Sequence, residues 1–292
     1  MKIALVIAVI AAAVASIAAQ NAPDAARLLM RRYMAGSRLQ YRMTGLENGT
    51  GYTVTIIATT RRTDDGRFVE EMAWSDMTVN GAPRVLAPES QAFRVAVTLE
   101  GGAPYELPDF SRARGLLGPV TDLLTFYADL FLAMHRGTLR DAGDRFYFAN
   151  PMTASWVDGT SVVLGEDHID FDFTLTAVDR ASGVATLLIK HVPSPAPKVR
   201  LPAGWMTAPV ADTPNNWVQV RKTATGFAAS VGKETFDVTL RVALADGRIL
   251  SATLDNPVTK ITRQCSDAAA SQCGEPMPDP TLRHIEMSLL PQ

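Results

Sequence analysis

The chain has 292 residues, a formal net charge of −2 and 47% hydrophobic residues. A chain of this size buries about three quarters of its unfolded surface on folding, so its size alone does not require a disulfide or a bound metal for stability. The charges are nearly balanced and no run of Lys and Arg concentrates a basic field. This composition argues against nucleic acid as a partner.

The first nineteen residues have the layout of a secretory signal peptide. Met1-Lys2 is charged, residues 3–14 are unbroken apolar, and residues 15–19 are mostly small. That order predicts a signal peptide over residues 1–19 and a periplasmic or extracellular mature protein. The alternative is an uncleaved membrane anchor, because the stretch approaches the roughly 17 residues that cross a bilayer. Its alanine content favours cleavage, after which no stable membrane span is expected.

A short helix is the first element predicted after the signal. Apolar residues recur at spacings of three and four from Ala26 to Met34, with arginines between them. Pro23-Asp24 precedes this stripe and Gly36 follows it, in the positions typical of helix ends.

From Leu39 onward the pattern alternates, and three hairpins are predicted. Each consists of two alternating runs around a turn that contains Asp and Gly: 52–60 with 68–74, 169–178 with 184–191, and 236–245 with 248–254. Asn48-Gly49 predicts a further turn, although residues 48–50 also match the glycosylation pattern. Alternation this regular favours an antiparallel meander with one dry face.

One long helix interrupts the strands, between Gly118-Pro119 and Gly137. It is apolar on most sides, which predicts burial against the dry face of the sheet. Its length and its two aspartates, Asp122 and Asp129, argue against a transmembrane span.

The expected fold is therefore α+β and mostly β. It comprises a large curved antiparallel meander, a short N-terminal helix, and one long apolar helix packed on the sheet. Residues 20–292 are predicted to form a single domain. The alternative is two sheet halves, 37–110 and 144–290, joined by the helix at 116–136.

Cys265 and Cys273 are the only cysteines in the chain. They flank a short polar loop in a chain predicted to reach an oxidising compartment, which predicts a local disulfide. A metal site is the alternative, but two thiols fall short of the four ligands of a structural zinc.

No local catalytic signature is present, so we predict no catalytic residue and no cofactor, which does not exclude an enzyme. The best remaining cluster is His168, Asp170 and Asp172, which share one face of a predicted strand. An imidazole with two carboxylates suits a divalent metal or an acid/base pair. A solvated strand face is the favoured interpretation.

The segment 192–216 contains six prolines, with Trp205 in its middle. Prolines at this density exclude both a helix and a central strand. An ordered loop of this length is either functional or a cover over a sheet edge.

This order of elements resembles the half-barrel periplasmic carriers of lipids and lipoproteins. Residues 123–127, 163–167 and 212–220 are similar to a family of uncharacterised exported bacterial proteins. The carrier resemblance implies a curved sheet folded around helices to form an apolar cavity.

The leading hypothesis is an exported binding protein that holds a hydrophobic small molecule or lipid between sheet and helix, lined by Phe126, Phe131 and Trp205. One alternative is an envelope or surface protein that contacts a protein partner through 192–216. Another is a hydrolase whose acid/base pair is assembled from distant strands.

Overall fold

The computed structural model describes residues 27–47, 49–100, 112–113, 115–136, 138–150, 156–157, 161–165, 169–192 and 217–291. The predicted signal peptide, His168, Trp205 and residues 193–216 of the proline-rich segment lie outside these residues.

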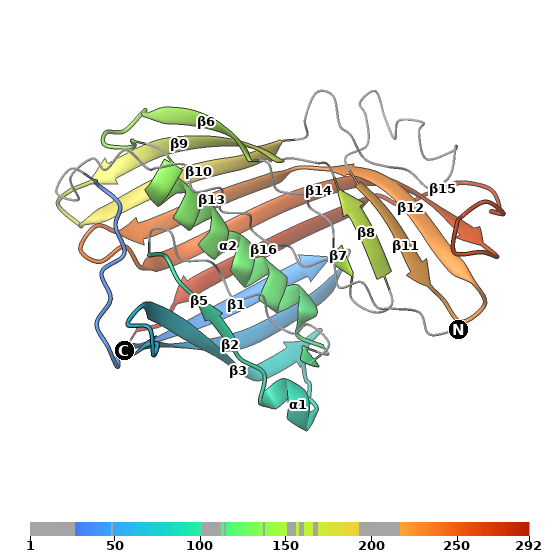
Figure 1. The fold of residues 1–292 in the computed structure, drawn as a ribbon, viewed down its shortest axis with the longest axis horizontal. Helices are drawn as coiled ribbons and strands as arrows, with labels where there is room; N and C mark the ends of the chain where they lie inside the picture. The colour runs from blue at the N-terminus through green and yellow to red at the C-terminus, as the bar shows by residue number, and fades with distance from the viewer. Residues whose placement is uncertain are drawn as a thin grey trace.

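One antiparallel sheet of sixteen strands accounts for most of the described chain, with two helices beside it (Figure 1). The strands are β1 (Arg38–Glu47), β2 (Thr50–Arg62), β3 (Phe68–Val79), β4 (Ala82–Pro83), β5 (Val95–Val97), β6 (Arg145–Asn150), β7 (Trp156–Val157), β8 (Ser161–Gly165), β9 (Ile169–Asp179), β10 (Val184–Val192), β11 (Trp217–Lys222), β12 (Phe227–Glu234), β13 (Phe236–Ala243), β14 (Ile249–Cys265), β15 (Met277–Pro278) and β16 (Thr281–Leu289). The helices are α1 (Pro88–Gln91) and α2 (Leu117–Arg136). The predicted fold class, mostly β with one large antiparallel sheet and one long apolar helix, is confirmed.

The predicted hairpins are confirmed in register. β2 pairs with β3, β9 with β10, and β13 with β14, each across its Asp- and Gly-containing turn. Glu47 and Thr50 pair across the Asn48-Gly49 turn, where Gly49 has a φ of 81°. Glycine adopts this conformation without the steric cost that a side chain brings, which is why the turn residues located these hairpins.

The predicted short N-terminal helix is wrong over its described residues. Residues 27–36 form an extended segment that ends in a turn. Its polar groups bond to the sheet: the Arg31 guanidinium pairs with the buried Glu70 carboxylate at 2.8 Å, and the Arg32 amide donates to the Asp246 carbonyl. Leu29 is buried, whereas Met34 is 72% exposed. These tertiary contacts outweigh the weak helical preference of a short apolar stripe.

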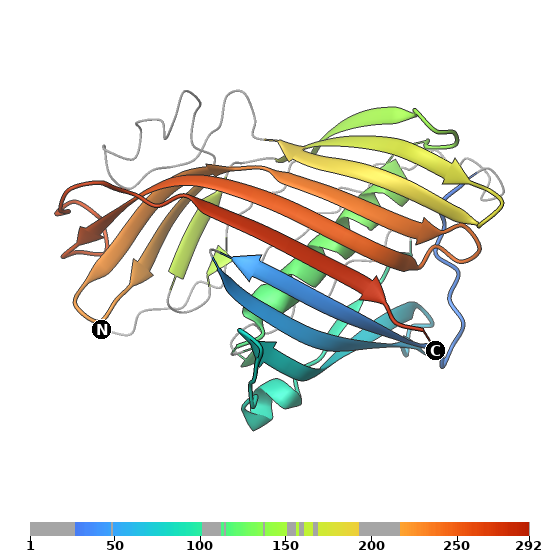
Figure 2. The same cartoon turned by 180° about the vertical axis from the view of Figure 1, so that it is seen from behind.

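Helix α2 lies across the concave face of the sheet (Figure 1), and the strands run side by side on the opposite face (Figure 2). Ten of its twenty residues are buried, among them Leu123, Phe126 and Leu130. The helix is long and apolar enough to cross a membrane, but more than half of its most apolar stretch is buried inside the protein. This burial is typical of a core helix.

A break crosses the middle of the sheet where β12 meets β13. Both strands pair with β14 in one continuous register, from Phe227 opposite Cys265 to Asp237 opposite Asp255, which places Thr235 opposite Pro257. Proline has no N–H to donate across the ladder. The side-chain amide of Asn256 donates instead to the Thr235 carbonyl at 2.8 Å.

The neighbouring strands are interrupted at the same break. β10 and β11 lie along the same edge of the β12–β13 line: His191 is opposite Phe236 and Trp217 is opposite Gly232. β10 therefore ends close to where β11 begins along this line of strands. The residues that face His191 and Trp217, Phe236 and Gly232, are four positions apart in the chain, or about 13 Å.

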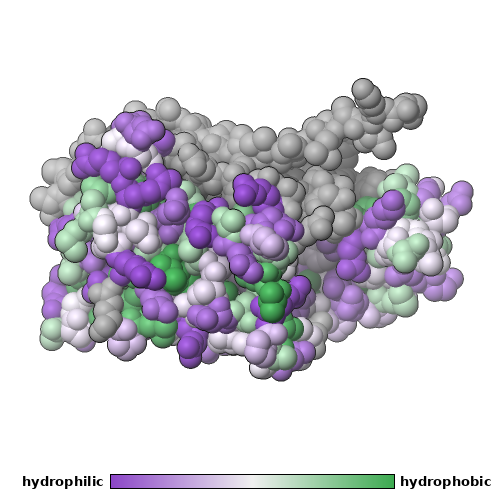
Figure 3. Space-filling view, turned by 90° about the horizontal axis from the view of Figure 1, so that it is seen from below, coloured by the Kyte–Doolittle hydropathy of each residue, from purple (hydrophilic) through white to green (hydrophobic). Residues whose placement is uncertain are grey.

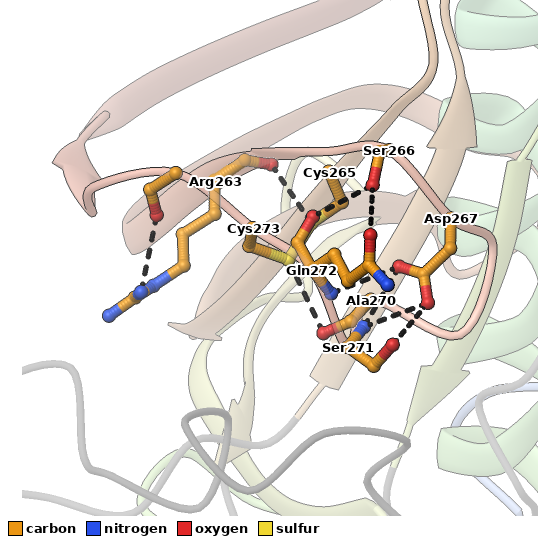
Figure 4. Close-up of a disulfide and its surroundings, with 9 residues drawn as sticks. Arg263, Cys265, Ser266, Asp267, Ala270, Ser271, Gln272 and Cys273 are labelled. Carbon is orange, nitrogen blue, oxygen red and sulfur yellow. Dashed lines mark hydrogen bonds between the residues drawn. A yellow bond between two sulfur atoms is a disulfide. The ribbon is translucent and has the colours of Figure 1, made fainter.

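The part of the sheet beyond the break has a second, smaller core. This core contains Val218, Ala229, Val231, Cys265 and Ala270. The predicted disulfide between Cys265 and Cys273 is confirmed at its margin (Figure 4). The enclosed loop is further held by the Asp267 carboxylate, which accepts hydrogen bonds from the Ser271 and Gln272 amides. Both the disulfide and the hydrogen bonds to Asp267 therefore stabilise the conformation of the loop.

Seen from below the view of Figure 1, the surface is mainly hydrophilic, with hydrophobic side chains in small patches between the polar ones (Figure 3). Helix α2 covers much of the concave face of the sheet (Figure 1).

The role of Asn256 is testable with a double-mutant cycle. Asn256→Ala should lower the free energy of unfolding by about 2–3 kcal/mol, because it leaves buried polar groups unpaired. Pro257→Val restores a backbone N–H, so the loss caused by Asn256→Ala should shrink by about 1 kcal/mol in that background. Urea unfolding of the four proteins measures both effects. If the effects of the two mutations on the free energy of unfolding were strictly additive, the Asn256 side chain would not replace the N–H that Pro257 lacks.

Candidate functional site

A line of polar side chains lies between α2 and the concave face of the sheet. Its members are all largely buried and come from six elements that are distant in the sequence: Tyr52, Asp122, Asp129, His191, Glu234, Asn256 and Arg283. We call this group the polar seam.

Asp122 forms one end of the polar seam. Its carboxylate accepts a hydrogen bond from the Tyr52 hydroxyl at 2.8 Å and forms an ion pair with Arg283. Arg283 also donates to the side-chain carbonyl of Asn256 at 3.0 Å, which connects α2 to β14 beside the break between β12 and β13. Burial raises the pKa of Asp122, although the nearby Arg283 guanidinium lowers it in part.

The position of Tyr52 depends on a glycine in the neighbouring strand. Gly45 pairs with Tyr52 across β1 and β2, and a Cβ on Gly45 would lie 2.2 Å from the Tyr52 ring. The ring therefore occupies the space that a side chain at residue 45 would take. Glycine at this point in β1 lets the Tyr52 hydroxyl reach Asp122.

Asp129 forms the other end of the polar seam. It follows Asp122 by seven residues, so both carboxylates project from the same face of α2. Its oxygens lie 2.7 and 2.9 Å from His191 Nε2, and the two side chains are 1% and 13% exposed. The His191 ring is held between Phe171 and Phe236, at centroid distances of 4.4 and 5.0 Å. Burial raises the pKa of Asp129, and His191 opposes that shift.

Glu234 completes the polar seam beside the sheet break. Its carboxylate accepts a hydrogen bond from Asn256 Nδ2 at 3.1 Å. Burial raises the pKa of Glu234, while the hydrogen bond and the charges of Arg283 and His191 lower it. Three carboxylates thus share one guanidinium and one imidazole in a poorly solvated space.

An apolar region adjoins the polar seam at the sheet edge formed by β6. Phe146 stacks on Phe173 at 4.4 Å, and Phe148 pairs in register with Phe171. Direct cross-strand partners share one face of a sheet, so Phe146 and Phe148 lie on the concave side with these buried rings. Both remain partly exposed at the edge.

Helix α2 contributes two further partly buried side chains to this apolar core, Phe131 and Leu132. The guanidinium of Arg136, at the end of the helix, lies 5.3 Å above the Phe148 ring and so places this end of α2 beside β6. We call Phe131, Leu132, Phe146 and Phe148 the aromatic margin.

The predicted lining residues lie in different surroundings. Phe126 is completely buried against the sheet, whereas Phe131 belongs to the aromatic margin, with its ring 4.6 Å from that of His135. Trp205 lies outside the described residues. Ligand contact by these three residues stays a prediction.

The predicted cluster on β9 is also only partly described. Asp170 is 3% exposed and Asp172 forms an ion pair with Arg145, while His168 lies outside the described residues. Within the described part of the chain, no group of three potential ligands is arranged to hold a metal ion. The metal hypothesis for His168, Asp170 and Asp172 stays a prediction.

The polar seam was not predicted from the sequence. From the sequence, Asp122 and Asp129 served only as an argument against a transmembrane span, yet both are buried and pair with residues of the sheet. Two aspartates seven residues apart on an otherwise apolar helix could have indicated a polar contact with the core. No sequence pattern identifies the strand residues with which they pair.

Comparison with known proteins identifies no matching family model and no matching curated protein. Among solved structures, the chain is similar to one described as showing lipid–protein interactions in lipovitellin. The TM-score is 0.43 at 8% sequence identity, and the match covers 89% of this chain but 26% of that chain. This chain therefore spans about a quarter of the lipovitellin length, and a likeness at this level carries no functional argument.

The raised pKa of Asp122 predicts the sign of a pH effect. Because the folded protein binds this proton more tightly than the unfolded chain does, the contribution of Asp122 to stability is largest in acid. It is lost as the pH rises through the folded-state pKa. The free energy of unfolding of the wild type, relative to that of Asp122→Asn, should therefore fall between about pH 3 and pH 7.

Asp179 provides a control of opposite sign. Hydrogen bonds from Ser182 and Ala181 lower its pKa, so its contribution is lost as the pH falls. In urea unfolding over the same pH range, the free energy of unfolding of the wild type, relative to that of Asp179→Asn, should rise with pH. If the free energy of unfolding of the wild type relative to Asp122→Asn also rose with pH, burial would not be the dominant influence on the pKa of Asp122.

Proposed function

We propose that this protein is an exported binding protein that holds a hydrophobic small molecule or lipid at the aromatic margin. The observation that carries the proposal is the partial exposure of four large apolar side chains, from α2 and β6, that pack against the main core. Such a surface is typical of a site for an apolar ligand.

The packing under α2 favours the aromatic margin over the centre of the helix–sheet interface. Leu123, Phe126 and Leu130 are completely buried, so their surfaces are already covered by the protein. The aromatic margin still has apolar area to lose to a ligand. Complete burial of one Phe or Leu side chain stabilises by about 1.5–3 kcal/mol, so the exposed parts of four such residues support a measurable affinity.

The polar seam supports a preformed site. Asp122 and Asp129 fasten α2 to the sheet at two points, two helical turns apart. A helix fixed in this way holds Arg136 over the Phe148 ring of β6 before any ligand arrives. Preorganisation reduces the conformational cost of binding.

Export is the second part of the proposal. It rests on the charged, apolar and small-residue order of residues 1–19. The disulfide between Cys265 and Cys273 is compatible with an oxidising compartment outside the cytoplasm.

The ligand site is testable on one strand. Phe148→Gln should weaken binding of a fluorescent apolar probe, 1-anilinonaphthalene-8-sulfonate, about tenfold, because the substitution removes roughly 1.4 kcal/mol of apolar contact. Tyr147→Gln is the matched control, since Tyr147 is the neighbouring residue on β6 and is 61% exposed. It should leave the affinity unchanged. Equal losses in the two variants would contradict a site on the concave side of β6.

Hydrolysis is a second candidate function, favoured by the pairing of Asp129 with His191. The buried carboxylate holds Nε2, and among the described residues Nδ1 has no hydrogen-bond partner. An imidazole oriented in this way by a carboxylate is the arrangement of a general base. The pair also joins α2 to β10, which agrees with the hypothesis of an acid/base pair assembled from distant elements.

This candidate predicts that the purified protein hydrolyses p-nitrophenyl esters and that His191→Ala abolishes the reaction. His284→Ala is the control, because His284 is an exposed histidine that also bonds to carboxylates, Asp255 and Glu286. Absence of ester hydrolysis in the wild type, or equal activity in His191→Ala, would remove a catalytic role for the pair in this reaction.

A further inference from the structure

We propose that the ligand of the aromatic margin is a single-chain anionic amphiphile, with its carboxylate bound to Arg136 and its alkyl chain on Phe146 and Phe148. This inference rests on the proposed function, because it assigns the chemical class of the ligand at the same site.

Arg136 has the position and the charge that such a head group requires. It is exposed in the last turn of α2, and its guanidinium lies 5.3 Å above the ring of Phe148. Within the described part of the chain, no carboxylate forms an ion pair with it. The planar guanidinium group carries N–H groups that can bind a carboxylate at two points.

A second arginine that forms no ion pair with a carboxylate among the described residues lies at the same end of the helix. The Arg27 guanidinium donates to the Met134 carbonyl at 3.5 Å and to His135 Nδ1 at 3.2 Å, and neither acceptor carries a negative charge. The carbonyl dipoles at the helix end offset only part of this positive charge. Two buried arginines differ from these: Arg31 forms an ion pair with Glu70, and Arg283 forms one with Asp122 of α2. The positive charge left at the aromatic margin therefore matches an anion.

The neighbouring apolar residues match a chain rather than a compact hydrophobic molecule. Phe146 and Phe148 are two residues apart on β6 and point to the same side, so their rings follow the sheet edge over about 7 Å. Arg136 lies over Phe148, at one end of this pair. A carboxylate at Arg136 therefore places the first methylene groups on Phe148 and later ones on Phe146.

The experiment compares dodecanoate with dodecanol, which has the same chain and no charge, by titration calorimetry below the micellar range. The wild type should bind dodecanoate at least tenfold more tightly. Arg136→Gln should lose about tenfold in dodecanoate affinity and retain its dodecanol affinity, and Arg136→Lys should lie between the two proteins. The side chain is exposed, so thermal unfolding should show the same stability for all three.

Arg62→Gln is the matched control, because the Arg62 guanidinium also lies over a ring, that of Phe68 at 4.6 Å, which belongs to β3 and not to the aromatic margin. It should bind both probes as the wild type does. Equal affinities of the wild type for dodecanoate and dodecanol would overturn the anionic head group and leave the apolar site standing. If neither probe bound, the proposed function would fail together with this inference.

Discussion

The arrangement of the molecule depends on the two aspartates by which α2 is fixed to the sheet. An apolar helix on an apolar surface can pack in many rotations at similar free energy, since the hydrophobic effect has no direction. Asp122 and Asp129 remove that freedom, because each must find a partner once it is buried. Arg283 on β16 and His191 on β10 supply these partners from opposite sides of β13 and β14. The pairs thereby select one orientation of the helix, and the burial of its apolar residues stabilises it.

The same network connects the helix to the break in the sheet. Arg283 binds both Asp122 and Asn256, and Asn256 bonds to Thr235 and Glu234 beside Pro257. A proline in a central strand normally weakens the ladder. Here its missing donor is replaced by a side chain that is itself oriented by the charged residues under α2. The same hydrogen-bonded network therefore stabilises both the interruption between β12 and β13 and the position of α2.

The sequence predicted the features that are encoded locally. Hairpins follow from Asp-Gly turns between alternating residues, α2 follows from Gly118-Pro119 and its apolar repeat, and the disulfide follows from two cysteines eight residues apart. The prediction of a helix near Ala26 was wrong, because Arg31 bonds to Glu70, a residue on β3 that is distant in the sequence. The polar seam escaped prediction for the same reason: each of its pairs joins residues at least 22 positions apart. Local patterns specify elements, whereas the partners of buried charges are set only when the elements assemble.

The place at which residues 193–216 join the sheet has an evolutionary consequence. The strand before this segment, β10, pairs with β13, and the strand after it, β11, pairs with β12, which directly precedes β13 in the chain. A segment attached in this way can gain or lose residues without shifting any pairing register, since both ends stay anchored by β12 and β13. Selection can therefore alter its length and composition while the sheet, α2 and the disulfide remain unchanged. Variation among descendants of this fold should accumulate there first.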